Sequence, residues 1–307
     1  KSLGNGVEPI EMVEKYGADA LRYYLTTSSA PGLDLRFDED KLSSTWNFIN
    51  KIWNASRFTL MNIEGIKELN LNDLTKEDKW ILSKLQKTIK NVRKYMDKYE
   101  FQNVGTILYD FVWSDFCDSY IEFSKFTIEK ESTKSTLLYV LTNILKMLHP
   151  FMPFVTEEIY QKLPIKDAES IMISPYPKVD KKLIFEDNEV EDIIDFIKTF
   201  RNVKQANNIP SDFKARFENE IDPIAINLLK LEGKIISSKL DIKSYKIISN
   251  YTNGEIYFEK ELSEEDIKAK ENLINNLKQS IERRKKLLAN ENYINKAPAH
   301  IVELDRK

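Results

Sequence analysis

The sequence holds few of the residues on which disulfide-rich and metal-binding proteins depend. Among 307 residues there is one cysteine, Cys117, and there are two histidines, His149 and His300. A single cysteine excludes an internal disulfide framework, and two distant histidines leave no cluster with zinc-site spacing. We therefore predict no metal site, a buried structural thiol at Cys117 and a cytoplasmic setting.

Glycine and long apolar runs are also scarce. Eight glycines are well under half the average share of roughly 7%, which argues against an open nucleotide-binding α/β domain and favours a mainly helical chain. No apolar run approaches the roughly 18 residues of a membrane span, and no secretion signal opens the sequence. We expect no membrane partner. The length suits about two domains at ~150 residues each.

Apolar periodicity predicts long amphipathic helices between Asp38 and about Pro164. Before them, a shorter helical stretch from Pro9 to Tyr24 is interrupted by Gly17. Short polar connections separate the long helices, and a helical bundle is the natural way to pack them. The predicted long helices span 40–62, 76–98, 101–130, 133–149 and 153–163.

From about residue 186 the pattern becomes mixed. Asp222 and Pro223 are typical of a helix start, because aspartate caps the first turn and proline fits the first position. The dipeptide Asn253-Gly254 predicts a two-residue hairpin turn of type I′, where both residues need positive φ. The predicted elements are helices at 188–206 and 223–236 and strands at 213–218, 242–249 and 255–259.

The last part of the sequence has coiled-coil spacing. Ile267, Ile274, Ile281 and Leu288 recur every seven residues, although Lys270 and Arg284 make the seam imperfect. The pattern breaks after Leu288, and a second short helix is predicted from Pro298. We interpret residues 262–307 as a partial coiled-coil hairpin.

Motifs for familiar enzyme chemistry are absent from the sequence. It contains no nucleophile elbow, no HExxH and no complete phosphate loop. His149, directly before Pro150, is interpreted as a helix-end residue rather than a base. The opening residues from Lys1 to Gly6 combine a cation, a hydroxyl and two glycines, which are the groups that hold phosphate.

One face of the helix predicted at 40–62 has the composition of an RNA-contact surface. Residues 41–62 contain no carboxylate, although acids make up 49 of the 307 residues. Amides read base edges, cations bind phosphates and aromatic rings stack on bases, whereas the alternative is an ordinary solvated face. We place Trp53 on the opposite, apolar side. The predicted contact residues are Asn47, Asn50, Lys51, Asn54, Arg57 and Phe58.

Two further basic clusters are candidates for contacts with the RNA backbone. The first follows one face of helix 76–98, where Asp97 is the only acid after residue 84, and the second lies near the end of the predicted coiled-coil helix. A solvated lysine face is the alternative for the first cluster. The clusters are Lys84, Lys87, Lys90, Lys94 and Lys98, and Arg283, Arg284, Lys285 and Lys286.

Several segments resemble motifs of class I aminoacyl-tRNA synthetases. Residues 1–9, KSLGNGVEP, look like the end of the KMSKS signature and the stretch that follows it. The similarity continues through YGADALR at 16–22, APGLDLRF at 30–37, NFINKIWNASRF at 47–58, HPFMPF at 149–154 and NKAP at 295–298. The APG-x-DLRF run and a coiled-coil end in place of a zinc-binding tail make the valyl type the most similar.

The resemblance implies a role for each region. Residues 1–38 would be the KMSKS remnant and stem-contact region, and 39–185 the helical anticodon-binding domain. Residues 186–261 would form a small α/β junction and 262–307 a coiled-coil arm. In the parent enzyme Lys1 and Ser2 would face ATP, which acts with Mg²⁺, and the partner would be the valine tRNA, bound by a monomer.

The resemblance is incomplete at the catalytic end. Nothing here is similar to the HIGH motif or the editing domain, so we expect this chain to bind tRNA without catalysis, although the parent is an enzyme. Two alternatives stay open: an isoleucyl-type synthetase fragment, or a non-catalytic helical scaffold that binds a protein. The net charge of -3 does not exclude RNA, because the basic residues gather locally.

Overall fold

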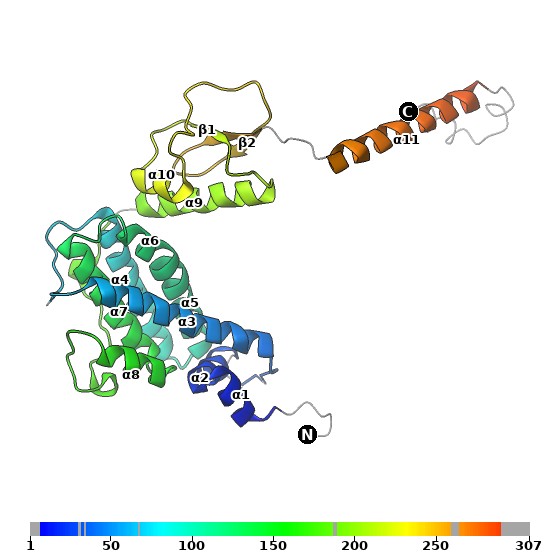
Figure 1. The fold of residues 1–307 in the computed structure, drawn as a ribbon. Coiled ribbons are helices and arrows are strands. Elements are labelled where there is room, and N and C mark those ends of the chain that lie inside the picture. Colours follow the sequence, from blue (N-terminus) through cyan, green and yellow to red (C-terminus); the bar gives the residue numbers. More distant parts are fainter. Residues whose placement is uncertain are drawn as a thin grey trace.

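The computed structural model describes residues 7–29, 32–33, 35–66, 68–186, 189–258 and 264–289. Within these ranges the chain is mostly helical, and its strands form one small sheet (Figure 1). None of the helices in this part of the chain combines the length and apolar character that a membrane span requires. The mainly helical class predicted from the sequence is confirmed.

Two short helices precede the bundle, α1 (Pro9–Tyr16) and α2 (Ala18–Thr27). Gly17 separates them at φ +85°, a conformation that glycine adopts without strain. The carboxylate of Asp19 accepts hydrogen bonds from the backbone N–H groups of Phe154 and Val155, at 3.2 and 2.7 Å. This contact joins α2 to the start of α8.

The bundle helices begin and end close to the predicted residues, because the capping signals were present in the sequence. Asp38 caps α3, and Thr75 and Asp78 form a reciprocal capping box at the start of α4. The bundle elements are α3 (Glu39–Asn62), α4 (Lys76–Met96), α5 (Phe101–Asp110), η1 (Phe111–Tyr120), α6 (Ile121–Ser124), α7 (Glu131–Leu148) and α8 (Pro153–Gln161).

The helix predicted at 101–130 is not uniform. Its middle third, η1, is a π-helix, and the helical stretch ends at Ser124. The Ser119 hydroxyl donates to the Ser114 carbonyl at 2.9 Å, five residues back, in keeping with the i→i+5 pattern of this winding. The wider turn brings residues that are five apart to the same side of the helix.

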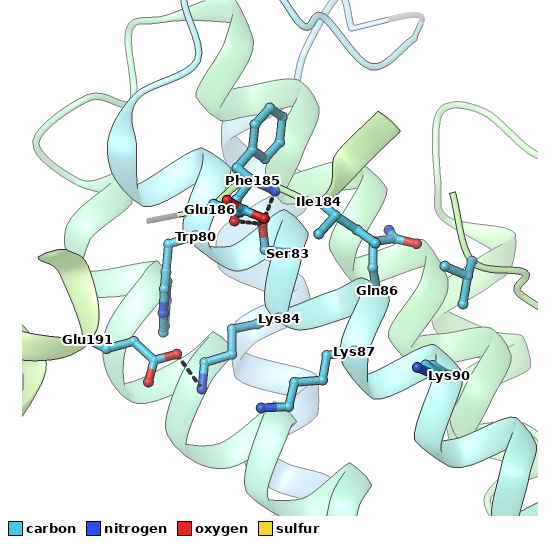
Figure 2. Close-up of a pocket in the computed structure, with 11 residues that line it drawn as sticks. Trp80, Ser83, Lys84, Gln86, Lys87, Lys90, Ile184, Phe185, Glu186 and Glu191 are labelled. Carbon is cyan, nitrogen blue, oxygen red and sulfur yellow. Dashed lines mark hydrogen bonds and ion pairs between the residues drawn. The ribbon is translucent and has the colours of Figure 1, made fainter. Parts of the chain in front are cut away.

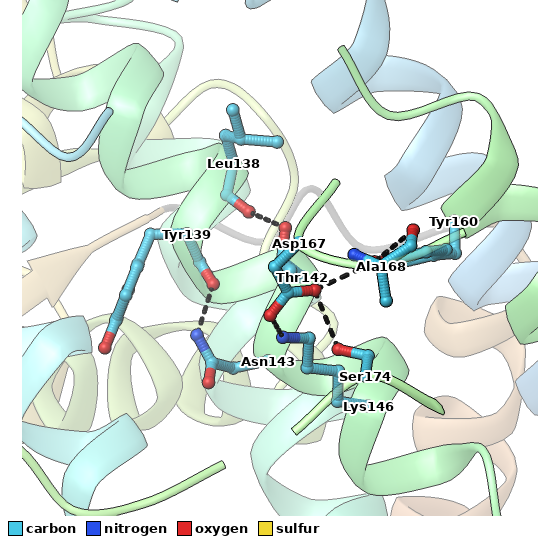
Figure 3. A network of polar contacts seen from close by, with 9 residues as sticks. All are labelled: Leu138, Tyr139, Thr142, Asn143, Lys146, Tyr160, Asp167, Ala168 and Ser174. Atoms are coloured by element: carbon cyan, nitrogen blue, oxygen red, sulfur yellow. Dashed lines mark hydrogen bonds and ion pairs between the residues drawn. The ribbon is translucent and has the colours of Figure 1, made fainter. Parts of the chain in front are cut away.

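Beyond α8 the chain runs over the bundle through two short 3₁₀ turns, η2 (Ile171–Ile173) and η3 (Lys181–Leu183). Asp167 fixes the first part of this segment (Figure 3). Its carboxylate accepts hydrogen bonds from Lys146 at 2.6 Å and from Tyr160 and Ser174 at 2.8 Å each.

A small α/β unit follows, with an antiparallel sheet in the order β1-β3-β2. The unit packs on the bundle through α9, and its buried residues belong to the same continuous core. Helix α10 ends seven residues earlier than predicted, because Lys230 takes a left-handed conformation at φ 54°. The elements are α9 (Glu189–Ala206), β1 (Lys214–Phe217), α10 (Pro223–Leu229), β2 (Ser244–Ile247) and β3 (Gly254–Tyr257).

The two-residue turn predicted at Asn253-Gly254 is wrong. Gly254 is the first residue of β3 and pairs with Ile247 of β2 and Phe217 of β1, so residues 248–253 make the connection. A Cβ on Gly254 would lie 2.5 Å from Cδ1 of Phe217 and 2.7 Å from the carbonyl oxygen of Arg216. Glycine is needed there for close packing and not for positive φ.

The long helix predicted for the coiled coil is present as α11 (Glu264–Leu288). Figure 1 shows it apart from the other helices. Its seam residues Ile274, Leu277 and Ile281 are each at least half exposed. The hairpin itself is not confirmed, because the helix predicted from Pro298 lies outside the described residues.

Candidate nucleic-acid interface

The solvent-exposed face of α3 brings together most of the predicted RNA-contact residues. Asn47, Asn54 and Arg57 are exposed, and Asn50 lies half-buried on the same side. The start of α3 packs on α2, and further along the helix contacts α7, α8 and η1, which leaves this narrow face free. Their contact with RNA stays a prediction.

Two aromatic residues of α3 lie on other sides than predicted. Phe58 is half-buried and packs against the main core, so it is not an aromatic of the solvent face. Trp53, assigned to the apolar side, is 42% exposed, and Trp46 is 44% exposed. The spacing 46, 50, 53, 57 is one helical stripe and could have shown that both indoles share a face with Asn50 and Arg57.

Lys51 is held by the π-helix and does not project freely. Its Nζ lies 2.5 Å from Oδ1 of Asp118 and 3.8 Å from the centroid of the Trp113 ring. Trp113 in turn stacks on Tyr109, with ring centroids 5.3 Å apart. The sequence reasoning missed Asp118, because a carboxylate 67 residues away supplies the negative charge that α3 itself lacks.

A cavity of about 260 Å³ opens between α3 and α8 beside Trp53. Arg57 and Lys162 line it, and Lys162 Nζ lies 5.4 Å from the centroid of the Trp53 ring. Met61, which is 73% exposed, adds an apolar edge. Lys162 also forms an ion pair with Glu158. An exposed indole beside this cavity can stack on a planar group such as a nucleobase.

The lysine row of α4 faces a different surface, beside α9 and η3. Lys84 is half-buried in ion pairs with Glu191 at 2.9 Å and Asp115 at 3.9 Å. Lys87, Lys90 and Lys94 are exposed, as is Lys98 just beyond the end of the helix. Figure 2 shows that Lys84, Lys87 and Lys90 line one pocket.

The remaining candidate residues are divided between described and undescribed parts of the chain. Residues 283–286 are exposed in the last turns of α11, where Lys286 lies 3.7 Å from Glu282. Lys1 and Ser2 lie outside the described residues. Among the residues that the structure places, no three His, Cys, Asp or Glu side chains gather as metal ligands would.

The two residues weighed as reactive groups occupy structural positions. Cys117 is buried, which confirms the buried structural thiol, and this burial raises the pKa of the thiol to about 12. His149 is the C-terminal cap of α7, with Nδ1 2.8 Å from the Thr156 hydroxyl. Its place as the cap confirms the helix-end interpretation, and burial lowers the pKa of the His149 side chain.

Two family profiles match the chain. The anticodon-binding domain of tRNA ligase matches residues 78–219, from the first turn of α4 to just past β1. The profile of class I tRNA synthetases for isoleucine, leucine, methionine and valine matches residues 1–38. Helix α3 lies between the two matched ranges.

Curated relatives match along the whole chain. The valine–tRNA ligases of Staphylococcus saprophyticus and Geobacillus stearothermophilus are 40% and 42% identical over all of it, and the chain spans 38% of the length of each. Among solved structures, the LeuRS of Agrobacterium radiobacter K84 is 19% identical over 60% of this chain and 22% of that one, with a TM-score of 0.49. On the sequence relatives, the chain belongs to the valine–tRNA ligase family of class I tRNA synthetases and carries its anticodon-binding domain.

Proposed function

We propose that this chain recognises the valine tRNA through the exposed face of α3. The observation that carries this proposal is the combination on one helix face of two exposed indoles, exposed amides and Arg57, with no acid in residues 41–62. The indoles stack on unpaired anticodon bases, and the amides hydrogen-bond to their edges. Asn47 and Asn54 are the exposed amides, Asn50 lies half-buried beside them, and Phe58 supports the face from beneath.

The basic clusters hold the RNA backbone at a distance from α3. Lys87, Lys90 and Lys94 of α4 and the group at 283–286 of α11 present exposed cations that suit phosphates. Lys84 takes part less directly, because Glu191 and Asp115 already share its charge. We place the functional regions at 1–38, 39–185, 186–261 and 262–307, as the family resemblance implies.

The parent enzyme attaches valine to its tRNA with ATP and Mg²⁺ in the cytoplasm, as a monomer. We assign neither Cys117 nor His149 a role in that reaction, since Cys117 is buried and His149 caps a helix. Lys1 and Ser2 stand at the position of the KMSKS signature and would contact ATP there. This chain binds tRNA, and the catalytic part of the parent enzyme carries out the reaction.

Fluorescence anisotropy with labelled anticodon stem-loops tests this function. We expect the valine stem-loop to bind, with log affinity falling linearly as log salt rises, and the isoleucine stem-loop to bind more weakly by part of the ~1–3 kcal/mol of a stacked base. Equal affinity for both would favour the isoleucyl-type alternative or backbone contacts alone. No binding of either at low salt would support the protein-binding scaffold.

A further inference from the structure

We propose that the pocket beside α4 binds a phosphate-type anion where Trp80, Lys84 and Lys87 converge. The pocket measures about 840 Å³ and lies between α4 and the segment from Val179 to Glu186, with Glu191 of α9 at its edge. This site is separate from the α3 face and does not depend on base recognition there.

An unused hydrogen-bond donor marks the site. Trp80 is 4% exposed, and its Nε1–H has no hydrogen-bond partner among the described residues. Trp80 lines both this pocket and a smaller one of about 220 Å³, which Asp115 and Lys198 also line. A buried N–H without an acceptor is costly, and an oxygen of a bound anion would remove that cost.

Lysine side chains line the pocket together with Trp80. Figure 2 shows the ammonium groups of Lys84 and Lys87 on the side of the pocket where the Trp80 ring nitrogen and the Glu191 carboxylate lie. Lys87 and Lys90 are exposed, and neither forms an ion pair with any residue that the structure places. Lysines and an indole N–H together offer a phosphate group both charge and hydrogen bonds.

The carboxylate of Glu191 pairs with Lys84 at this site. Its Oε1 lies 2.9 Å from Lys84 Nζ, and its side chain is 50% exposed. Because the Glu191 side of this ion pair is half exposed, a multiply charged anion can displace the carboxylate into solvent. Once Glu191 has moved, Lys84 keeps only its longer contact of 3.9 Å with Asp115, and Lys84, Lys87 and the indole N–H can face the incoming oxygens.

Isothermal titration of the whole chain with inorganic phosphate and tripolyphosphate, at constant ionic strength, tests this site. We expect saturable binding that Trp80→Phe weakens at least about tenfold, since the ring stays and only the N–H is lost. Lys87→Ala should weaken it similarly, and Glu191→Gln should strengthen it several-fold. Lys246→Ala is the matched control, because Lys246 is an exposed lysine of β2 that does not line the pocket.

Competition with tRNA distinguishes the two sources of a phosphate group. If tRNA displaces tripolyphosphate, and Lys87→Ala weakens both, the pocket takes a backbone phosphate. If both bind together, the pocket takes a free phosphate compound. No saturable binding, or equal weakening by Lys87→Ala and Lys246→Ala, would overturn the site, whereas loss of base recognition at α3 would leave it intact. Lys87 is exposed, so its variant is informative even if Trp80→Phe unfolds the chain.

Discussion

Lys51 and Asp118 form an ion pair of 2.5 Å between α3 and the π-helix, and the same ammonium lies 3.8 Å from the Trp113 ring centroid. Trp113 and Asp118 are five residues apart, which an α-helix would place about 140° from each other. The π-helical winding turns both toward one lysine. Lys51, which the sequence placed on the RNA-contact face, is therefore already paired with a carboxylate.

Replacing Asp118 should change the charge of the α3 surface more than the stability of the fold. Asp118→Asn removes the partner of Lys51, so we expect tighter binding of the valine stem-loop at low salt and a salt slope steeper by up to about 0.9. The unfolding free energy should fall by no more than about 1 kcal/mol, because Asp118 is half exposed. Anisotropy at several salt concentrations measures the slope, and an unchanged slope would mean that Lys51 does not reach a phosphate.

Trp53 and Phe58 should give opposite results when they are replaced by alanine. Trp53→Ala should weaken stem-loop binding by ~1–3 kcal/mol with a smaller change in stability than Phe58→Ala, because the indole is 42% exposed. Phe58→Ala should lower the unfolding free energy by about 2 kcal/mol or more, since its ring packs on the core. Anisotropy and urea denaturation of both variants check this.

Ile248→Ala is the control for Trp53→Ala, because Ile248 is 74% exposed and lies in the β2–β3 connection. It should alter neither binding nor stability beyond about 0.5 kcal/mol. Loss of binding in Phe58→Ala without loss of stability would restore Phe58 to the contact face.

Gly254 should tolerate no side chain. Gly254→Ala sets a methyl group 2.5 Å from Phe217 Cδ1 and 2.7 Å from the Arg216 carbonyl oxygen, so backbone as well as a ring must shift. We expect a loss of ~1–3 kcal/mol in unfolding free energy, measured by urea denaturation. Lys246→Ala, on the exposed side of β2, serves as the control. A neutral result for Gly254→Ala would show that β1 and β3 are not packed this closely.

Low pH should destabilise the segment after α8, which the hydrogen bonds of the Asp167 carboxylate fix in place. Burial raises the pKa of the Asp167 carboxyl, but hydrogen bonds from Lys146, Ser174 and Tyr160 outweigh it and lower that pKa to about 2. Because the folded pKa lies below the ordinary 3.8, the stabilisation is present above about pH 4 and is lost as the pH falls toward 2. Asp167→Asn should be less stable at pH 6 and equal to the parent near pH 2.

Denaturation of the two proteins by urea at pH 6, 4 and 2.5 measures this difference. Glu169→Gln is a nearby exposed control and should show no such convergence. A gap between Asp167→Asn and the parent that stays constant with pH would mean that the carboxylate charge contributes nothing.

Local signals in the sequence located most helices. Asp38, the Thr75–Asp78 capping box and Pro153 are recognisable starts, and helix starts depend on neighbouring residues only. The winding of 111–120 and the role of Gly254 were not predictable in this way. Gly254 is needed because Phe217 packs against it, and the winding of 111–120 is visible only in the tertiary structure, where Trp113 and Asp118 meet Lys51.

The sequence by itself determined the family, the helical class and the acid-free character of α3, because motifs, periodicity and composition are properties of the chain. Only the tertiary structure decided which arc of α3 faces water. Trp53 and Phe58 are both aromatic and both near the edge of the apolar side, and their burial depends on where the neighbouring helices pack against α3. The ion pairing of Lys51 was decided in the same way, because its partner Asp118 is distant in the sequence and adjacent only in the folded chain.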